Sequence, residues 1–172
     1  PQNVPKSISG KTGGRPQNHF PEIDSGNPQN DFRSLHIAGT NGKGSVCSYL
    51  SNAFISCSYK TGLFTSPAVF DENECFKING ENISQTEKSV YLSQIYTVCS
   101  RYDINPTLFE IDVAIACLFF ESNNCNICIF ECGMGGKDDA TNVFENPVAC
   151  VFTSIGPDHM KYLGNIFLSV IN

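Results

Sequence analysis

The sequence predicts an α/β fold in which helices cover both faces of a doubly wound, mainly parallel sheet. Short apolar runs typical of buried strands alternate along the chain with segments whose apolar residues recur at helical spacing. Each predicted strand is also followed by a polar or glycine-rich turn. Because ligands bind beyond the carboxyl ends of the strands in such sheets, these turns indicate one site at one edge of the sheet.

The N-terminal segment differs in composition from the remainder of the chain. Residues 1–25 are rich in Pro, Gly, Ser and Asn and show little hydrophobic periodicity, so they predict a loose arm. Residues 26–172 are predicted to form one domain. Since the chain begins with Pro1 and stops inside an apolar pattern, we expect that domain to be incomplete at its C-terminus.

Residues 35–54 read as a strand, a glycine turn and a helix. The apolar run Leu35–Ala38 predicts the strand, and the turn at 39–45 contains three glycines. The helix that follows is predicted to bury one face, formed by Val46, Tyr49, Leu50, Ala53 and Phe54.

This turn is suited to binding a nucleotide triphosphate. Its glycines let the backbone approach phosphate groups closely, and the helix start offers unpaired N–H groups to an anion. Lys43 adds a positive charge, and the Ser45 hydroxyl can reach a Mg²⁺ ion on the same phosphates. Gly44 interrupts the strict Walker A pattern, and the alternative is a tight turn that only needed glycines. The predicted nucleotide-binding residues are Gly39, Thr40, Asn41, Gly42, Lys43, Gly44 and Ser45.

The next elements follow from local signals. Tyr59–Thr65 predicts a second strand that ends at Ser66-Pro67, and residues 71–80 are polar and turn-rich, with Asn79-Gly80 as a turn. A capping box at Ser84–Glu87 begins a helix that continues to about Arg101. The remaining predicted elements are a helix from Pro106 to about Ser122 with Asn105 or Thr107 as its cap, strands at 125–132 and 148–154, and a helix from Asn165.

Composition excludes several classes of partner. The net charge of −6 and the absence of basic runs argue against nucleic acid, and the longest apolar run, Ala114–Phe120, is too short to cross a membrane. Nine irregularly spaced cysteines favour reduced thiols in the cytoplasm, with a mitochondrial form left open. Cys125 and Cys128 are not expected to bind zinc, because strand residues three apart point to opposite faces.

The residue sequence of the glycine turn at 39–45 resembles the ATP site of the Mur ligase superfamily, and specifically that of folylpolyglutamate synthase and dihydrofolate synthase. Gly26-Asn27-Pro28-Gln29 and four later stretches fit the same family. The resemblance extends from about Gly26 to the end of the chain. It implies ATP and Mg²⁺ as cofactors and a catalytic role for Lys43.

Three further motifs resemble the family's metal-binding segments. They are Thr65-Ser66-Pro67, the run from Glu131 to Asn142, and Asp158-His159. The resemblance implies that Ser66, Glu131 and His159 hold Mg²⁺ together with Ser45, and that His159 is also catalytic. The alternatives are a strand terminator at Ser66-Pro67, a Lys or Arg partner for Glu131, and a helix cap at Asp158.

Other stretches resemble the family's substrate-binding segments. Thr107, Phe109 and Glu110 match a motif associated with the pterin end of the substrate, and Asp139 lies in the matching glycine-rich loop. A capping box is the structural alternative for Thr107 and Glu110. Ala68 and Cys75 depart from the family pattern on a segment expected to face the substrate.

The resemblance implies an ATP-dependent amide ligase. ATP would phosphorylate a carboxylate of a folate or dihydropteroate, and the amino group of L-glutamate would attack the acyl phosphate. A monomer is expected for the complete protein, and this chain alone is expected to be inactive. The alternatives are another P-loop ATPase and an inactive nucleotide-binding remnant. The sequence does not separate dihydrofolate synthase from folylpolyglutamate synthase.

Overall fold

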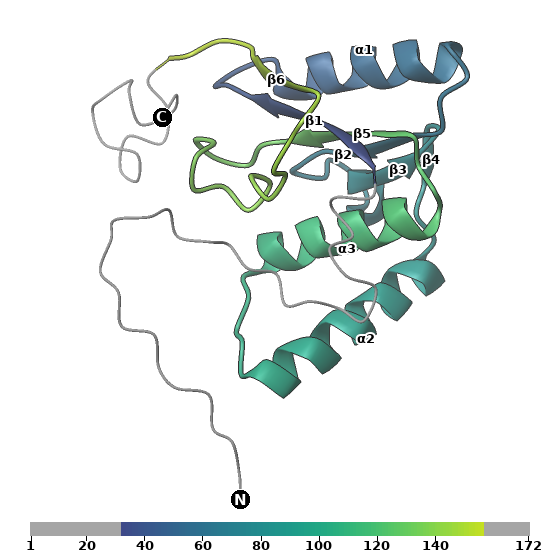
Figure 1. Ribbon diagram of the computed structural model, residues 1–172, viewed down its shortest axis with the longest axis vertical. Coiled ribbons are helices and arrows are strands. Elements are labelled where there is room, and N and C mark those ends of the chain that lie inside the picture. The colour runs from purple at the N-terminus through teal and green to yellow at the C-terminus, as the bar shows by residue number, and fades with distance from the viewer. Residues whose placement is uncertain (1–31, 157–172) are drawn as a thin grey trace, which may run out of the picture.

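A computed structural model of the chain describes residues 32–156. It contains a sheet flanked by three α-helices, with α1 on one side and α2 and α3 on the other (Figure 1). The predicted helix from Asn165 lies outside the described residues. In chain order the elements are β1 Arg33–Ala38, α1 Lys43–Ser56, β2 Thr61–Phe64, the 3₁₀ helix η2 Glu72–Cys75, β3 Phe76–Ile78, β4 Glu81–Asn82, α2 Gln85–Tyr102, α3 Leu108–Ser122, β5 Ile127–Glu131 and β6 Ala149–Phe152.

The sheet has six strands in the order β4-β3-β2-β5-β1-β6. The four strands β2, β5, β1 and β6 are parallel, whereas β3 and β4 form an antiparallel hairpin at one edge. Leu35 of β1 pairs with Ile129 of β5 and with Ala149 of β6, which places β1 inside the sheet. This arrangement confirms the predicted α/β class with a mainly parallel sheet.

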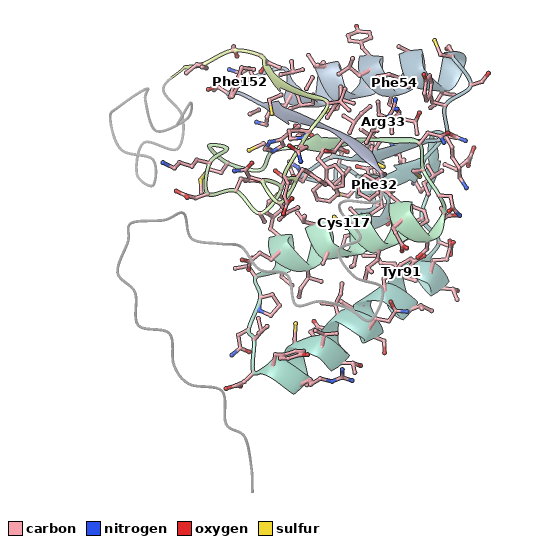
Figure 2. The ribbon with its side chains drawn as sticks, viewed as in Figure 1. Phe32, Arg33, Phe54, Tyr91, Cys117 and Phe152 are labelled. Carbon is pink, nitrogen blue, oxygen red and sulfur yellow. The ribbon has the colours of Figure 1, made fainter. Side chains whose placement is uncertain are left out.

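The two faces of the sheet carry separate cores. The smaller core lies under α1 and includes Leu35, Ile37 and Ile129. The larger core lies between the sheet and α3, where Figure 2 shows Phe32 and Cys117. The outer helix α2 packs on α3, and the Tyr91 ring lies 6.2 Å from that of Phe119. Strands β2 and β5 are buried at every residue, and β1 at every residue after Arg33, which explains the apolar runs in these strands.

The buried face of α1 differs from the predicted one. Cys47 and Ser51 are buried, whereas Tyr49 is 78% exposed and Ala53 is also exposed. Val46, Leu50 and Phe54 pack at the border of the smaller core, as predicted. Because this helix is only weakly amphipathic, the sequence pattern did not determine which of its faces is buried. The small side chains of Cys47 and Ser51 allow the helix to approach the sheet closely.

The predicted turn at Asn79-Gly80 is confirmed, but it joins two short strands that were not predicted. Asn79 and Gly80 have φ values of 50° and 88°, and the hairpin of β3 and β4 flanks them. Positive φ at both central residues is what a two-residue hairpin turn requires. The strands escaped prediction because they contain only three and two residues.

The starts of α2 and α3 are fixed by side-chain caps. Ser84 and Glu87 form the predicted capping box of α2. Thr107, not Asn105, caps α3, so Pro106 precedes the helix and is not in its first turn as predicted. The Thr107 side chain accepts from the backbone N–H of Glu110, which satisfies a donor that the helix leaves unpaired.

The cysteine pair at 125 and 128 corrects a second prediction. Cys125 precedes β5, so strand alternation does not separate its side chain from that of Cys128, and both thiols lie in the same core. Burial raises the pKa of the Cys128 thiol, and the neighbouring Cys125 thiol acts in the same direction. All nine cysteines are free thiols.

Gly62 of β2 provides a test of packing in the larger core. A Cβ atom there would lie 2.8 Å from the Phe120 ring and 2.9 Å from the Cys128 sulfur. We expect Gly62→Ala to destabilise the protein by about 1–3 kcal/mol through overpacking, measured by urea unfolding.

The exposed substitution Ala53→Ser is the control for Gly62→Ala and should change stability little. Combining Gly62→Ala with Phe120→Leu should cost less than the sum of the two single changes, because both act on the same contact. Strict additivity would contradict this explanation.

No helix among residues 32–156 combines the length and apolar character needed to cross a membrane.

Candidate nucleotide and metal site

The carboxyl ends of the parallel strands meet at one edge of the sheet, as predicted. The glycine turn follows β1, Ser66 lies two residues beyond β2, and Glu131 is the last residue of β5. Parallel pairing of β5 with β1 and β2 brings these three segments together. Asp158 and His159 lie outside the described residues.

The glycine turn has the conformation of an anion-binding loop. Gly39 has a φ of 132°, and a Cβ atom there would collide with Thr153. Gly42 has a φ of 84° and is the N-cap of α1, which begins at Lys43. The N–H groups in the first turn of a helix have no acceptor within that helix and point toward the helix start. The start of α1 therefore offers donors and a positive dipole end to a phosphate.

The Lys43 side chain folds back over the glycine turn. Its ammonium group donates to the backbone carbonyl of Gly39 at 2.9 Å. This contact keeps the positive charge beside the place where the α1 N–H groups converge. A phosphate oxygen bound there would compete with the carbonyl for the Lys43 protons, and charge favours the phosphate.

Glu131 provides a buried carboxylate next to this charge. Strand alternation directs its side chain to the face that α1 covers, and the residue is 7% exposed. Its Oε2 atom accepts from the Ser66 backbone N–H at 3.3 Å, and a Cβ atom on Gly44 would lie 3.6 Å from the same oxygen. Burial raises the pKa of the Glu131 carboxyl, while the Ser66 N–H and the charge of Lys43 lower it.

The surroundings of Glu131 suit a hard divalent cation. Within residues 32–156 no Lys, Arg or His forms an ion pair with this carboxylate, which leaves the predicted Lys or Arg alternative without support in that range. A buried carboxylate is costly unless a cation meets it. Mg²⁺ prefers oxygen ligands, and Ser66 lies directly beside Glu131.

The loop after β6 clamps the glycine turn, which the sequence did not predict. The Thr40 and Asn41 N–H groups donate to the Ser154 carbonyl at 2.6 Å and to its hydroxyl at 3.1 Å. The Thr153 hydroxyl donates to the Asn41 carbonyl at 2.7 Å. The Gly39–Asn41 half of the predicted phosphate cradle is therefore engaged by protein, and the Gly44 backbone faces the Glu131 carboxylate.

The predicted substrate residues gather on the other face of the sheet. Phe109, at the start of α3, packs against Phe64 with ring centroids 6.0 Å apart. A Cβ atom on Gly133 would lie 2.7 Å from the Phe109 ring and 3.2 Å from the Asp139 carboxylate. Phe109 and Asp139 are thus brought together over the glycine-rich loop that follows β5.

Hydrogen bonds within the protein already engage the polar members of this group. Thr107 and Glu110 form the capping box of α3 and are at its exposed start. Asp139 is 7% exposed, and its carboxylate accepts from the Met134 N–H at 2.7 Å and from the Thr141 N–H at 2.9 Å. Their contact with a substrate stays a prediction.

The two departures from the family pattern lie deeper than expected. Cys75 is buried in the larger core at the end of η2, and Ala68 packs against the same core. Burial raises the pKa of the Cys75 thiol to about 11. Cys75 therefore packs as a small apolar side chain, and the expectation that this segment faces the substrate stays a prediction.

The geometry defines an α/β domain in which a glycine turn at the start of α1 lies beside the buried carboxylate of Glu131. The Mur ligase middle domain matches residues 37–167. The chain therefore belongs to the Mur ligase family, as the resemblance implied.

Curated relatives are folate-related synthases. The chain is 40% identical over 140 residues to the probable dihydrofolate synthetase of Schizosaccharomyces pombe, covering 81% of this chain and 34% of that protein. It is 41% identical over 145 residues to the dihydrofolate synthase/folylpolyglutamate synthase of Bacillus subtilis, with the same shares covered. The chain spans about a third of the length of these relatives.

Solved structures share the fold over most of the chain. E. coli FolC in complex with DHPP and ADP aligns with a TM-score of 0.79 at 30% identity, covering 83% of this chain and 34% of FolC. The apo form of L. casei FPGS aligns with a TM-score of 0.81 at 30% identity, covering 95% of this chain and 41% of that one. An FPGS–AMPPCP complex aligns with a TM-score of 0.80 at 32% identity, covering 84% and 37%.

Proposed function

We propose that this chain is the Mg-ATP-binding part of a folate-type amide ligase. In the complete protein, ATP phosphorylates a carboxylate of a folate or dihydropteroate, and L-glutamate displaces the phosphate to form the amide. The observation that carries this proposal is the juxtaposition of Lys43, Glu131 and Ser66 at the carboxyl edge of a Mur ligase sheet. The relatives named synthases of dihydrofolate and folylpolyglutamate support the substrate class.

The chain's own residues bind and orient the phosphates. The N–H groups at the start of α1 hold a phosphate, and Lys43 neutralises negative charge on the phosphoryl group as it transfers. Ser45 lies in the first turn of α1, two residues after Lys43, and its hydroxyl would bind the Mg²⁺ ion that the phosphates hold. The rigid clamp from Thr153 and Ser154 keeps this turn in one conformation, which reduces the reorganisation needed at reaction.

Mg²⁺ would be held by Ser45, Ser66 and Glu131, with His159 as the further ligand that the family implies. When bound, the ion would neutralise negative charge on the phosphates, in addition to the charge that Lys43 neutralises. Burial makes ionisation of the Glu131 carboxyl unfavourable when no cation is near. A bound cation would therefore stabilise the charged carboxylate.

The substrate would lie over the loop that follows β5, on the α3 side. Phe109 offers an aromatic edge, and Asp139 offers a fixed carboxylate. Thr107 and Glu110 would contact the pterin end from the start of α3. The partners are therefore small molecules, namely ATP, L-glutamate and a folate or dihydropteroate. We further expect the complete protein to be a cytoplasmic monomer.

Binding and turnover assays test this proposal together. Purified chain is titrated with Mg-ATP by calorimetry, and the complete protein is incubated with ATP, L-glutamate and either dihydropteroate or a reduced folate. We expect saturable Mg-ATP binding by the chain, and a glutamylated product with release of phosphate from the complete protein. ATP binding without any product from the complete protein would favour an inactive remnant, and ATP hydrolysis that ignores both substrates would favour another P-loop ATPase.

Gly133 provides a test of the substrate side alone. Gly133→Ala places a methyl group against Phe109 and Asp139, so we expect the loop to shift and the KM for the folate substrate to rise about tenfold or more. Mg-ATP affinity should stay unchanged, because Glu131 and α1 lie on the opposite face of the sheet. Steady-state kinetics of the complete protein measure both values.

Ala140→Ser is the control for this substitution, because it alters a half-buried neighbour in the same loop that the proposal does not use. An unchanged folate KM in Gly133→Ala, or an equal rise in the ATP KM, would remove the substrate assignment of this loop.

A further inference from the structure

Three different metal-ligating side chains meet beneath the loop that follows β5. His36 comes from β1, Cys132 follows the last residue of β5, and Asp139 comes from the loop. All three are buried, and one ligand atom from each lies within 4.8 Å of the other two. Within residues 32–156 this is the one such group of His, Cys, Asp and Glu.

The pairing of β1 with β5 creates this cluster and separates it from the nucleotide site. His36 is opposite Phe130, and Cys132 extends the strand pairing by donating its N–H to the Ile37 carbonyl at 2.9 Å. Because neighbouring strand residues point to opposite faces, Glu131 faces α1 and Cys132 faces α3. The cluster and the carboxylate predicted to hold Mg²⁺ therefore lie on opposite faces of the sheet.

A hydrogen-bonded hydroxyl at the centre fixes the state of the imidazole. The Thr141 hydroxyl donates to Asp139 Oδ1 at 2.5 Å, and it lies 2.6 Å from His36 Nε2. Since the hydroxyl has one proton, the network assigns the second bond to a donating His36 Nε2–H. That hydrogen bond places Nε2, and not Nδ1, on the side of Thr141 and Asp139, so a metal ion would bind Nε2 once its proton has moved to Nδ1 of the neutral ring.

We propose that His36, Cys132 and Asp139 form a binding site for a thiophilic divalent metal ion such as Zn²⁺. A thiolate, an imidazole and a carboxylate are the ligands that zinc takes in proteins, whereas Mg²⁺ prefers oxygen alone. The Thr141 hydroxyl or a water molecule supplies a fourth ligand. This proposal does not depend on the proposed ligase function, but the ion would engage the same Asp139 carboxylate that is proposed to meet the substrate.

Binding exchanges a proton for the metal. The Cys132 S–H bond breaks and its proton leaves to solvent, while the His36 Nε2 proton is replaced by one on Nδ1. Metal–sulfur and metal–nitrogen bonds then form without any change of oxidation state. Ligand atoms up to 4.8 Å apart must draw together around the ion, because metal–ligand bonds measure ~2.0–2.3 Å. The Cys132 side chain, just after the end of β5, would move toward Asp139, which the Met134 and Thr141 N–H groups hold in place. The bound ion joins β1, the end of β5 and the loop.

Cobalt titration tests the proposal, because Co²⁺ substitutes for Zn²⁺ and shows a thiolate charge-transfer band. We expect the purified chain to bind one Co²⁺ with this band, and excess Zn²⁺ to abolish it. Cys132→Ser should weaken binding about 100-fold or more. His36→Gln should do the same while its amide N–H keeps a donor for Thr141, so circular dichroism should show an intact fold.

The matched controls are Cys150→Ser, which removes an exposed thiol, and Cys128→Ser, which removes one of the paired buried thiols. Neither should change the cobalt band. A band that persists in both Cys132→Ser and His36→Gln, or that vanishes in Cys128→Ser, would overturn the proposal.

X-ray absorption of the zinc-loaded wild-type chain gives a result that does not rely on variants folding. We expect one sulfur and two or three nitrogen or oxygen ligands. Two or more sulfur ligands would assign the metal to Cys125 and Cys128, and a shell of oxygen alone would assign it to surface carboxylates. Either result, or no zinc retained after gel filtration, would refute the site.

Discussion

Replacing Lys43 with alanine is expected to weaken Mg-ATP binding about 10- to 100-fold. The Lys43 ammonium is the charged group that the structure places over the glycine turn, where it donates to the Gly39 carbonyl at 2.9 Å. Hydrogen bonds to charged groups contribute about 1.5–3 kcal/mol, which corresponds to this range of affinity. Calorimetric titration of wild type and Lys43→Ala with Mg-ATP measures the change.

Lys60→Ala is the matched control, because Lys60 precedes β2 at the opposite end of the sheet. It removes the same charge from the protein and should leave ATP affinity unchanged. Equal affinities for wild type and Lys43→Ala would show that the glycine turn is not the nucleotide site. Equal losses in the two variants would indicate only an effect of net charge.

Glu131→Gln is expected to have opposite effects on ligand binding and on stability. The amide retains an acceptor for the Ser66 N–H but cannot meet a divalent cation with charge. We expect the gain in ATP affinity that Mg²⁺ provides to disappear, again about 10- to 100-fold. Without ligands, the variant should be more stable than wild type near neutral pH.

The sign of the stability change follows from the direction of the pKa shift. Burial raises the pKa of the Glu131 carboxyl above its value in the unfolded chain. The stability from the protonated carboxyl is fully present below the unfolded pKa and is lost as pH rises through the folded pKa. Glutamine does not ionise, so the variant avoids this loss, and thermal unfolding from mildly acidic to neutral pH should show the two curves diverging.

Glu145→Gln, at an exposed position, is the control and should follow the wild-type stability curve. Two results would count against the assignment of Glu131. One is a variant that still gains ATP affinity from Mg²⁺ as wild type does. The other is a variant less stable than wild type at neutral pH, which would mean that the carboxylate has a structural partner that the amide fails to replace.

Sequence patterns determined the elements whose signals are local. The glycine turn, the capping boxes of α2 and α3, and the apolar strands β1 and β5 were confirmed because each depends on residues within a few positions of one another. Parallel strands then required the motifs after β1, β2 and β5 to share one edge of the sheet. That step predicted the proximity of Lys43, Ser66 and Glu131 without coordinates.

Only the tertiary structure decided which side chains meet across long separations. The rotation of α1 that exposes Tyr49 depends on how closely the helix approaches the sheet. The clamp of Ser154 on Asn41 and the bond of His36 to Thr141 join residues more than 100 positions apart. The spacing of residues in the sequence does not indicate which side chains will form such hydrogen bonds. Strand register and the path of the loops decide which side chains come within hydrogen-bonding distance. Strand alternation alone places Glu131 and Cys132 on opposite faces of the sheet, but only the register of β1 against β5 brings His36 beside Cys132.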